Sequence, residues 1–463
     1  MFTGAAVLSG AAALDAPALT LRGDVGLGND WPVVGDLGGL YIGMPSLEQV
    51  RRFDPEAFAA GTTSEIDAAG TGASALFSGA LSEDGFGTAF SRREDDAATM
   101  TLVVGAPLSS GGPDTTDAGA VYVYTGLDAH PAGDFLAANA DGVVAADAAY
   151  AHFGSTVAAC GDLDGDGLGD WMAAAEWGAG GGDLSGDVYV ALSGRGDTVG
   201  VHAWSDLVHL AGPSEAAAYG RALWCTDSLD GDDAAELVIG APGAFDAEGR
   251  LQPGRVDVWS GAALAAAVAG GGAPGRPDLS LYGAYTGDRF GSSLAVGDLT
   301  GDGRADLVIG APGANSQGTD NDVAGAVYVY PSRLVPDAVG LAGRYEPDYR
   351  GTLLGEDPRG TLGATVLTAD LDADGLVDLC VGAPGTNTAG VDESVQAGTV
   401  YVYAGGEAGW TGDLPLSAAA VTLAAPRQYL RAGERLAAAD LDGDGTLDLA
   451  VVTREPDPAT ASP

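Results

Sequence analysis

The chain has no lysine, and arginine supplies all 20 of its basic residues against 65 acidic ones. The formal charge of −45 argues against nucleic acid as a partner, because binding to a phosphate backbone depends on clustered Lys and Arg. It also argues against contact with anionic membranes. No run of about 20 apolar residues is present, so we expect no direct membrane insertion.

Cysteine is scarce, with Cys160, Cys225 and Cys380 widely spaced. An odd number at such spacing is not the pattern of a disulfide framework. Cys160 and Cys380 lie within apolar, strand-like runs. We therefore expect the cysteines to be small buried residues, and no spacing of Cys with His indicates a zinc site.

Histidine is also rare, and the four residues are His130, His152, His202 and His209. Neither Gly-x-Ser-x-Gly nor His-Glu-x-x-His occurs, so the common hydrolase patterns are missing. We expect a non-catalytic protein, with His152 at the surface. A polysaccharide-active protein stays open as an alternative, because the many Asp residues could include a catalytic pair.

The sequence instead contains a repeated segment, which reads FGSSLAVGDLTGDGRADLVIGAPG from Phe290 in its clearest copy. Seven copies are anchored on glycines spaced 59 to 72 residues apart, so they account for essentially all 463 residues. We therefore expect one domain covering residues 1–463. The anchors are Gly28, Gly87, Gly154, Gly220, Gly291, Gly363 and Gly433.

Each copy reads as four short strands bounded by Gly, Pro and Asp. Examples of the third and fourth strands are Gly325–Tyr330 and Leu279–Tyr282. Repeated four-stranded units predict an all-β fold, a seven-bladed β-propeller of antiparallel blades. The seventh copy stops after its second strand at Val452, whereas Gly4–Gly10 has the third-strand pattern and Ala18–Leu21 follows it. We expect these N-terminal strands to complete the last blade and close the ring.

An acidic loop of the form Asp-x-Asp-x-Asp-Gly-x-x-Asp separates the first two strands of the later copies. The predicted side-chain ligands are Asp162, Asp164, Asp166 and Asp170 in copy three; Asp298, Thr300, Asp302 and Asp306 in copy five; Asp370, Asp372, Asp374 and Asp378 in copy six; and Asp440, Asp442, Asp444 and Asp448 in copy seven. A degraded loop in copy four offers Asp230, Asp232 and Glu236. Backbone carbonyls are expected from Leu168, Arg304, Leu376 and Thr446.

Calcium matches this pattern, because it takes six to eight oxygens at about 2.3–2.6 Å, whereas magnesium dehydrates reluctantly. The alternative is that Asp and Gly only form turns, but four matching loops at one repeat position favour a metal. We expect four structural Ca²⁺ sites, and a fifth if the degraded loop holds an ion. Five divalent ions would bring the charge only from −45 to −35, so most of the acidity belongs to a solvated surface.

An aromatic-Gly pair, an acidic loop and Gly-Ala-Pro together resemble the FG-GAP repeat of integrin α-subunit propellers and many bacterial surface proteins. The resemblance implies calcium loops in the later blades, here copies three to seven. It also implies an extracellular or cell-surface recognition or adhesion module. A calcium-dependent carbohydrate-binding or polysaccharide-active propeller is the alternative. We expect a monomer whose partner is a protein ligand or a glycan.

In integrins the face without calcium binds ligand, so the resemblance implies the same face here. Strand alternation places it at the turns that join strands two to three and four to one. The long connections on that side are Leu108–Ala118, Gly243–Pro253, Gly313–Ala324 and Gly385–Ala397. Aromatic candidates for ligand contact are Tyr150, Tyr219, Tyr285 and Tyr429, for which packing between blades is the alternative role.

Overall fold

Strands are the main regular structure wherever the structure of the chain is described. The computed structural model describes residues 20–23, 32–36, 39–54, 63–66, 73–80, 83–96, 99–110, 115–128, 131–164, 166, 168–192, 200–226, 229, 235–246, 251–272, 274–314, 323–331, 351–387, 396–406, 410–425 and 429–453. One α-helix, α2 (Gly261–Ala269), lies in these ranges, with short 3-10 turns. No helix in the described ranges has the length and apolar character needed to cross a membrane.

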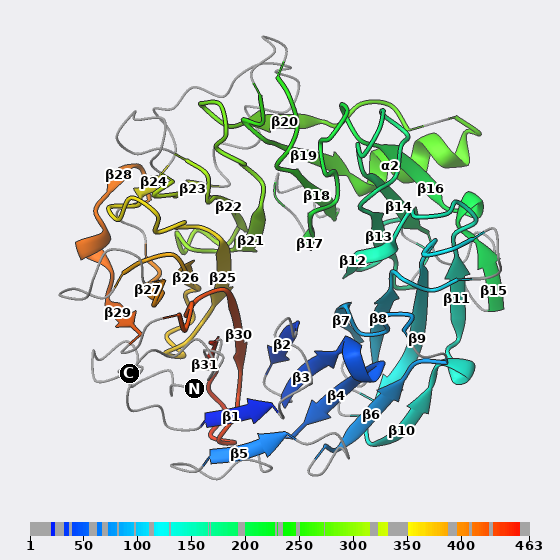
Figure 1. Cartoon of the computed structure of the whole chain (residues 1–463), viewed down its shortest axis with the longest axis horizontal. Helices are drawn as coiled ribbons and strands as arrows, with labels where there is room; N and C mark the ends of the chain where they lie inside the picture. The colour runs from blue at the N-terminus through cyan, green and yellow to red at the C-terminus, as the bar shows by residue number, and fades with distance from the viewer. Residues whose placement is uncertain are drawn as a thin grey trace.

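Six sheets each contain four antiparallel strands in chain order, and they are arranged around a common centre (Figure 1). The first three sheets contain β2 (Val33–Asp36), β3 (Gly39–Met44), β4 (Gln49–Phe53) and β6 (Ala75–Ser78); β7 (Ala89–Asp96), β8 (Thr99–Ala106), β9 (Ala120–Asp128) and β11 (Gly142–Ala145); and β12 (Phe153–Ala159), β13 (Trp171–Ala175), β14 (Asp187–Ala191) and β16 (Val208–Ala211). The next three contain β17 (Ala222–Thr226), β18 (Glu236–Ala241), β19 (Arg255–Ser260) and β20 (Leu279–Tyr282); β21 (Ser293–Gly297), β22 (Asp306–Ala311), β23 (Ala326–Tyr330) and β24 (Gly351–Leu354); and β25 (Thr365–Ala369), β26 (Asp378–Ala383), β27 (Thr399–Tyr403) and β29 (Val421–Ala424).

The repeat pattern and the strands agree closely. The fourth strand predicted at Leu279–Tyr282 is β20, and the third strand predicted at Gly325–Tyr330 is β23. The two parts of the repeated motif meet in space, because the N–H of Gly291 donates to the carbonyl of Gly310 at 3.1 Å. The motif therefore joins the start of the first strand to the end of the second.

Small residues let neighbouring sheets pack closely. Gly325 forms a bridge to Leu362 of the following repeat and has a φ of +84°. A Cβ added at Gly325 would overlap the backbone nitrogen of Leu362. The glycine before the third strand is therefore required by both the backbone conformation and the approach of the next sheet.

Three additional strands cross between sheets, and the sequence did not predict them. β10 (Gly133–Leu136) pairs in parallel with β6, β15 (Gly200–Ala203) pairs with β11, and β28 (Gly412–Leu414) pairs with β24. Each of these strands belongs by sequence to the next repeat. It therefore continues the outer edge of the preceding sheet and covers hydrogen-bonding groups that the edge would expose.

Strands near the two ends of the chain form two further pairs. β1 (Thr20–Gly23) pairs in parallel with β5 (Thr63–Ile66), and β30 (Arg435–Ala439) pairs with β31 (Asp448–Val452). The predicted strand at Gly4–Gly10 lies outside the described residues. The second predicted N-terminal strand appears as β1, whose described partner is β5 and not a strand of the last sheet.

The first and last sheets pack against each other. Leu40 and Ile42 of β3 form one apolar cluster with Ala437 and Ala439 of β30. Figure 1 shows β30 and β31 next to the blue strands from the start of the chain. Residues about 400 positions apart therefore share a core.

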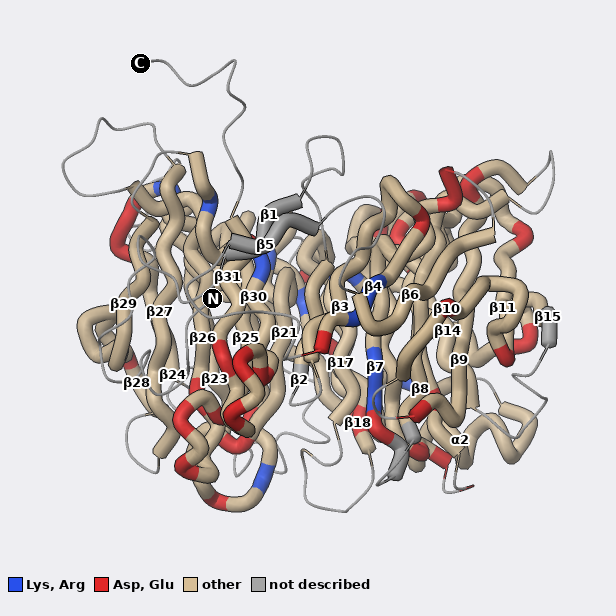
Figure 2. The backbone as a smooth tube through the Cα atoms, turned by 90° about the horizontal axis from the view of Figure 1, so that it is seen from below, with Lys and Arg blue, Asp and Glu red and all other residues tan. Residues whose placement is uncertain are grey.

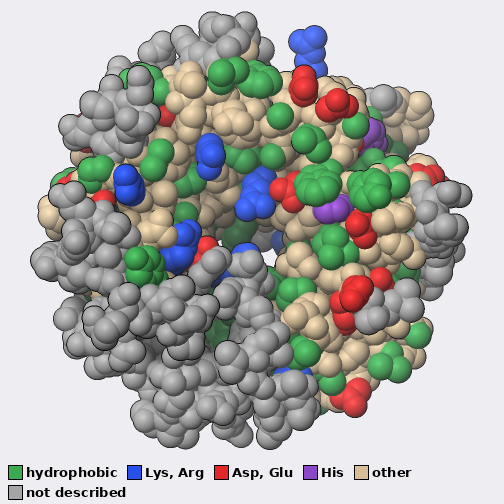
Figure 3. Space-filling model, in the orientation of Figure 1, with side chains coloured by type: hydrophobic (Ala, Val, Ile, Leu, Met, Phe, Trp, Pro, Cys, Tyr) green, Lys and Arg blue, Asp and Glu red, His purple; other side chains and the backbone are tan. Residues whose placement is uncertain are grey.

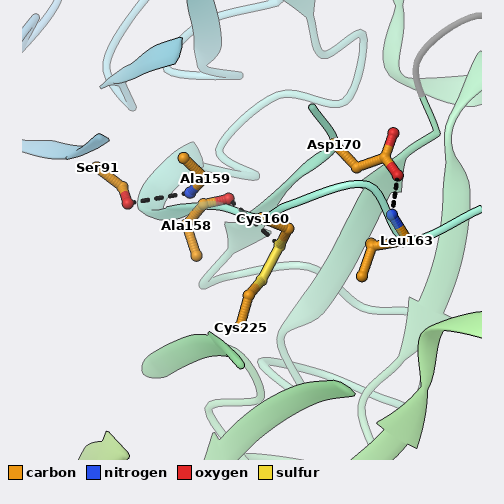
Figure 4. Close-up of a disulfide and its surroundings, with 7 residues drawn as sticks. All are labelled: Ser91, Ala158, Ala159, Cys160, Leu163, Asp170 and Cys225. Carbon is orange, nitrogen blue, oxygen red and sulfur yellow. Dashed lines mark hydrogen bonds between the residues drawn. A yellow bond between two sulfur atoms is a disulfide. The ribbon is translucent and has the colours of Figure 1, made fainter. Parts of the chain in front are cut away.

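The prediction that the cysteines form no disulfide is wrong, although Cys160 is buried as expected. Cys160, directly after β12, forms a disulfide with Cys225 in β17 (Figure 4). The two Cα atoms are 5.2 Å apart. The 65-residue separation is about one repeat, so the two positions fall on adjacent inner strands. Cys380 in β26 is buried and free, as expected.

Candidate metal loops and the opposite face

The acidic loops lie on one side of the molecule. Each follows the first strand of a sheet and precedes the second, as between β21 and β22 or between β25 and β26. Figure 2 shows red acidic segments gathered at the lower edge beneath β23 and β26 and near β18. The loops therefore all lie on the same face of the molecule.

One contact recurs in all five loops. The last acidic residue is buried and accepts a hydrogen bond from the backbone N–H seven positions earlier. The donor and acceptor pairs are Leu163 with Asp170 (2.7 Å), Leu229 with Glu236 (2.6 Å), Leu299 with Asp306 (2.9 Å), Leu371 with Asp378 (2.9 Å) and Leu441 with Asp448 (2.9 Å). The glutamate of the degraded fourth loop therefore makes the same contact as the aspartates.

The first and third acidic residues shape the turn. Asp298 accepts N–H groups from Gly301 at 2.7 Å and from Gly303 at 2.8 Å, so its carboxylate lies inside the loop. Asp302 accepts the N–H of Arg304 at 3.0 Å, and Asp444 accepts that of Thr446 at 2.8 Å. These contacts are Asx-type turns, and they hold the predicted carbonyl-donor residues beside the carboxylates.

Three loops bring carboxylates close enough to share one ion. In each, single oxygens of three residues lie within 4.8 Å of one another. The groups are Asp162, Asp164 and Asp170; Asp370, Asp372 and Asp374; and Asp440, Asp442 and Asp448. The groups do not include Asp166, Asp378, Asp444 or the fifth-loop residues Asp298, Asp302 and Asp306. Asp230 and Asp232 lie outside the described residues.

The loops show the electrostatic cost expected of carboxylates gathered for a cation. Burial, together with the smaller effects of the neighbouring Asp372 and Asp370, raises the pKa of Asp378 to about 6. The pKa of Asp448 is raised to about 6 for the same reasons, burial first and then Asp442. Positive charge at these positions would reverse both effects.

Several buried oxygens in the loops also lack a donor among the described residues. They are the hydroxyl of Thr300, Oδ1 of Asp370 and Oδ1 of Asp448, one in each of the last three loops. Buried polar atoms normally find a partner, so these three oxygens are available to a cation. Hard oxygen donors of this kind fit Ca²⁺.

The opposite face is formed by the turns at the other strand ends. A backbone hydrogen bond joins the turn after the second strand to the turn before the first strand in five repeats. The donors and acceptors are Leu108 and Asp84 (2.9 Å), Trp177 and Ala151 (3.3 Å), Gly243 and Ala217 (3.0 Å), Gly313 and Asp288 (3.1 Å), and Gly385 and Gly360 (3.1 Å). The two kinds of turn therefore form one continuous surface.

Exposed apolar side chains are concentrated on this surface. Of eleven large hydrophobic residues exposed in the described chain, eight lie on these turns. They are Leu108, Tyr150, Trp177, Leu184, Leu251, Tyr285, Val323 and Tyr429. Figure 3 shows the face, with hydrophobic side chains and arginines around the central opening. Such a concentration marks an interaction surface more often than a solvated one.

The four tyrosines named from the sequence divide into two groups. Tyr219 is buried, and its hydroxyl accepts the indole N–H of Trp259 at 2.9 Å, so it packs between sheets. Packing is the wrong role for Tyr150, Tyr285 and Tyr429, which are 46 to 67% exposed. These three therefore remain candidates for ligand contact.

Sequence reasoning missed the most exposed tryptophan of this face. Trp177 is 48% exposed, and its ring stacks on His152 with centroids 4.0 Å apart. It occupies the position where other repeats carry Gly-Ala-Pro, and that departure was the available signal. His152 thus belongs to an aromatic pair at the surface.

Comparisons with known proteins agree with this architecture. The FG-GAP repeat family matches residues 290–330 and 362–403. Phosphatidylinositol-glycan-specific phospholipase D of Bos taurus is 34% identical over 38% of this chain and 20% of its own length. Integrin alpha-5 of Xenopus laevis is 34% identical over 39% of this chain and 16% of its own length. Integrin alpha-3 of Mus musculus is 34% identical over 27% and 10%.

The fold and the acidic loops thus define an all-β protein that carries FG-GAP repeats. Its homologues include integrin α subunits and phosphatidylinositol-glycan-specific phospholipase D. The matched segments span a fifth or less of the length of these relatives.

Proposed function

We propose that this chain is a non-catalytic, extracellular recognition module, a closed seven-bladed propeller that binds calcium on one face and a protein ligand on the other. The observation that carries the proposal is the division between the two faces. Acidic loops with a repeated geometry occupy one side, and eight of eleven exposed large hydrophobic residues occupy the other. The first face stabilises the module, and the second recognises the partner.

The calcium assignment uses the ligands predicted from the sequence, and the metal would supply only structural stabilisation. Two features of the loops support it. Burial first, and then the neighbouring carboxylates, raise the pKa of Asp378 and Asp448, so both effects disfavour the charged form in the absence of a cation. Buried oxygens without donors at Thr300 and Asp370 leave room for further bonds. A divalent cation would satisfy both conditions.

Ring closure rests on the crossing strands. β5 relates to β1 as β10 relates to β6, β15 to β11 and β28 to β24, since each later strand pairs in parallel with an outer strand. By this analogy β1 is the outer strand of the seventh blade. Packing of Leu40 against Ala437 supports the same closure.

Two features support an extracellular location. The Cys160–Cys225 disulfide is typical of an oxidising compartment, because cytosolic thiols are kept reduced. Calcium loops of this type suit the millimolar calcium found outside cells.

The direct test is thermal unfolding at fixed high ionic strength, with EDTA and then with added Ca²⁺ or Mg²⁺. We expect EDTA to lower the midpoint and Ca²⁺ alone to restore it. An unchanged midpoint would mean that the acidic loops are only turns, and the calcium part of the proposal would be wrong.

A carbohydrate ligand is the second candidate, and the stacked pair of His152 and Trp177 favours it. An exposed aromatic ring offers an apolar surface to the C–H face of a sugar. Binding of a glycan array that is lost in Trp177→Ala would select this candidate. Binding of a protein partner with no glycan signal would select the first.

A further inference from the structure

The calcium loops of the fifth and sixth repeats are bonded to each other through a short turn that follows β27. The N–H of Gly405 donates to Oδ1 of Asp378, the last carboxylate of the sixth loop, at 3.0 Å. The N–H of the next residue, Gly406, donates to the carbonyl of Leu299 in the fifth loop at 2.9 Å. Two adjacent N–H groups therefore connect the two loops.

This path continues into both predicted metal sites. Leu299 uses its own N–H to contact Asp306, the last carboxylate of the fifth loop, at 2.9 Å. Asp378 uses its second oxygen to accept the N–H of Leu371 at 2.9 Å. The closing carboxylates of the two loops are thus joined by a continuous series of backbone and side-chain hydrogen bonds.

A second set of contacts joins the loops directly. The N–H of Val377 approaches the carbonyl of Asp298, the first residue of the fifth loop, at 3.4 Å. A Cβ added at Gly301 would lie 2.8 Å from the side chain of Leu376. The segment 376–377, which contains the predicted carbonyl ligand of the sixth loop, therefore rests on the start of the fifth.

The seventh loop provides an internal reference. Among the described residues, no backbone hydrogen bond joins the loop at 440–448 to the loop at 370–378. The two loops nevertheless have the same side-chain pattern and equivalent internal contacts, such as Gly445 with Asp440 at 2.9 Å. Any difference in behaviour between the pairs would therefore come from the bonded turn.

We propose that the fifth and sixth loops bind Ca²⁺ as a positively coupled pair, while the seventh binds independently. This inference rests on the calcium assignment made under the proposed function. An ion in the sixth loop fixes Asp378 and residues 376–377. It thereby orders the Gly405–Gly406 turn, which holds Leu299, and places Val377 against Asp298. The second ion then binds a loop that is already ordered, so less conformational entropy is lost on binding.

Electrostatics acts in the opposite direction. The first dication reduces the negative potential that attracts the second, because the fifth loop carries three Asp residues and the sixth carries four. Salt screens this effect over a Debye length of about 3 Å at 1 M ionic strength. The coupling should therefore be measured at high salt. There the effect transmitted through the hydrogen-bonded Gly405–Gly406 turn exceeds the electrostatic effect.

The test is a pair of double-mutant cycles on the calcium-induced shift in the unfolding midpoint of the full chain. The substitutions Asp302→Asn, Asp374→Asn and Asp444→Asn remove equivalent exposed carboxylates from the fifth, sixth and seventh loops. We expect Asp302→Asn and Asp374→Asn to be non-additive, each alone losing nearly as much of the shift as the double variant. Asp374→Asn and Asp444→Asn, in the sixth and seventh loops, should be additive.

Calorimetric titration with Ca²⁺ gives the size of the effect. Loss of the sixth site should weaken the fifth by at least about fivefold, the lower end of ordinary coupling between sites. Gly405→Ala should remove the non-additivity, because its Cβ would lie 2.6 Å from the carbonyl oxygen of Val377. Gly275→Ala is the control, since its Cβ has no neighbour within 4 Å.

The possible outcomes distinguish the proposed coupling from the proposed calcium sites. Additive effects in both cycles, with a normal calcium shift in the wild-type chain, would overturn the coupling and leave the calcium sites in place. Absence of any calcium shift in the wild-type chain would overturn both. If Gly405→Ala does not fold, the two cycles still decide the matter.

Discussion

Cys160 and Cys225 are bonded to each other although 65 residues separate them in the chain. Cys160 lies next to the third acidic loop, and the N–H of Cys160 donates to the carbonyl of Asp170 at 2.7 Å. The disulfide therefore ties the base of a predicted calcium site to the first strand of the next sheet.

Loss of this disulfide should destabilise the chain. A 65-residue closed loop corresponds to about 4 kcal/mol in the chain-entropy treatment of a cross-link. We expect Cys160→Ser and Cys225→Ser each to lower the denaturant midpoint by similar amounts, and the double variant to add little. Thiol titration of the denatured, unreduced chain should find one thiol, from Cys380; three would contradict the bond.

The closing carboxylates should control calcium affinity. Asp448→Asn keeps the size of the side chain but removes a buried charge from the seventh loop. We expect calorimetry to show calcium binding at that loop weakened by about tenfold or more, as for loss of one charged contact. Asp413→Asn, an exposed change outside the loops, serves as the control and should leave binding unchanged.

Calcium-free stability should increase on acidification near pH 6. The folded-state pKa values of Asp378 and Asp448 are raised to about 6, above the ordinary value of 3.8. A raised pKa contributes stability below the unfolded value, and this contribution is lost as pH rises through about 6. In EDTA we therefore expect these two residues to make the chain more stable at pH 5 than at pH 7.

With Ca²⁺ bound, the pH trend should reverse, because the ion stabilises the ionised carboxylates. Midpoints measured from pH 5 to 7, with and without Ca²⁺, check both directions. The Asp378→Asn and Asp448→Asn double variant provides the control and should lose most of the pH effect in EDTA. The same slope in that variant would assign the effect to other groups.

The face opposite the loops should contain the binding residues. Trp177→Ala and Tyr150→Ala remove exposed rings without disturbing a core, so the unfolding midpoint should stay the same. We expect affinity for a partner captured with the wild-type chain to fall by about tenfold or more for an anchor residue, as measured by surface plasmon resonance. Leu136→Ala, exposed outside these turns, should keep full affinity.

The glycine before the third strand should be intolerant of a side chain. Gly325→Ala places a Cβ at a φ of +84° and against the backbone of Leu362. We expect a loss of at least about 2 kcal/mol in urea unfolding. Gly275→Ala has no such contact and should leave the unfolding curve unchanged.

Local chemistry explains which predictions succeeded. Strand β20 was predicted at its observed bounds, because alternating apolar residues flanked by Gly and Pro signal a strand without reference to the rest of the fold. The acidic loops were found for the same reason, since their ligands lie within nine residues of one another. The final acidic residue opens the second strand in four of the five loops, including Glu236 in β18, and Asp170 directly precedes β13.

Long-range pairing explains the failures. β10, β15 and β28 are only three or four residues long, and their partners belong to the preceding repeat. Trp177 was passed over because it replaces a repeated motif, and only its stacking on His152 reveals a surface role. The helix α2 was missed because its Ala-rich segment, between the third and fourth strands of its sheet, is not part of the repeated motif.

The sequence by itself determined the repeat, the strand order within each unit and the position of every acidic loop, because these depend on periodicity and on contacts between near neighbours. The tertiary structure decided what distant residues do together. It paired Cys160 with Cys225, joined Asp378 to Leu299 through a two-glycine turn, and separated the exposed Tyr150 from the buried Tyr219. These relationships depend on how successive sheets pack around a centre, and that packing brings together residues that no local pattern connects.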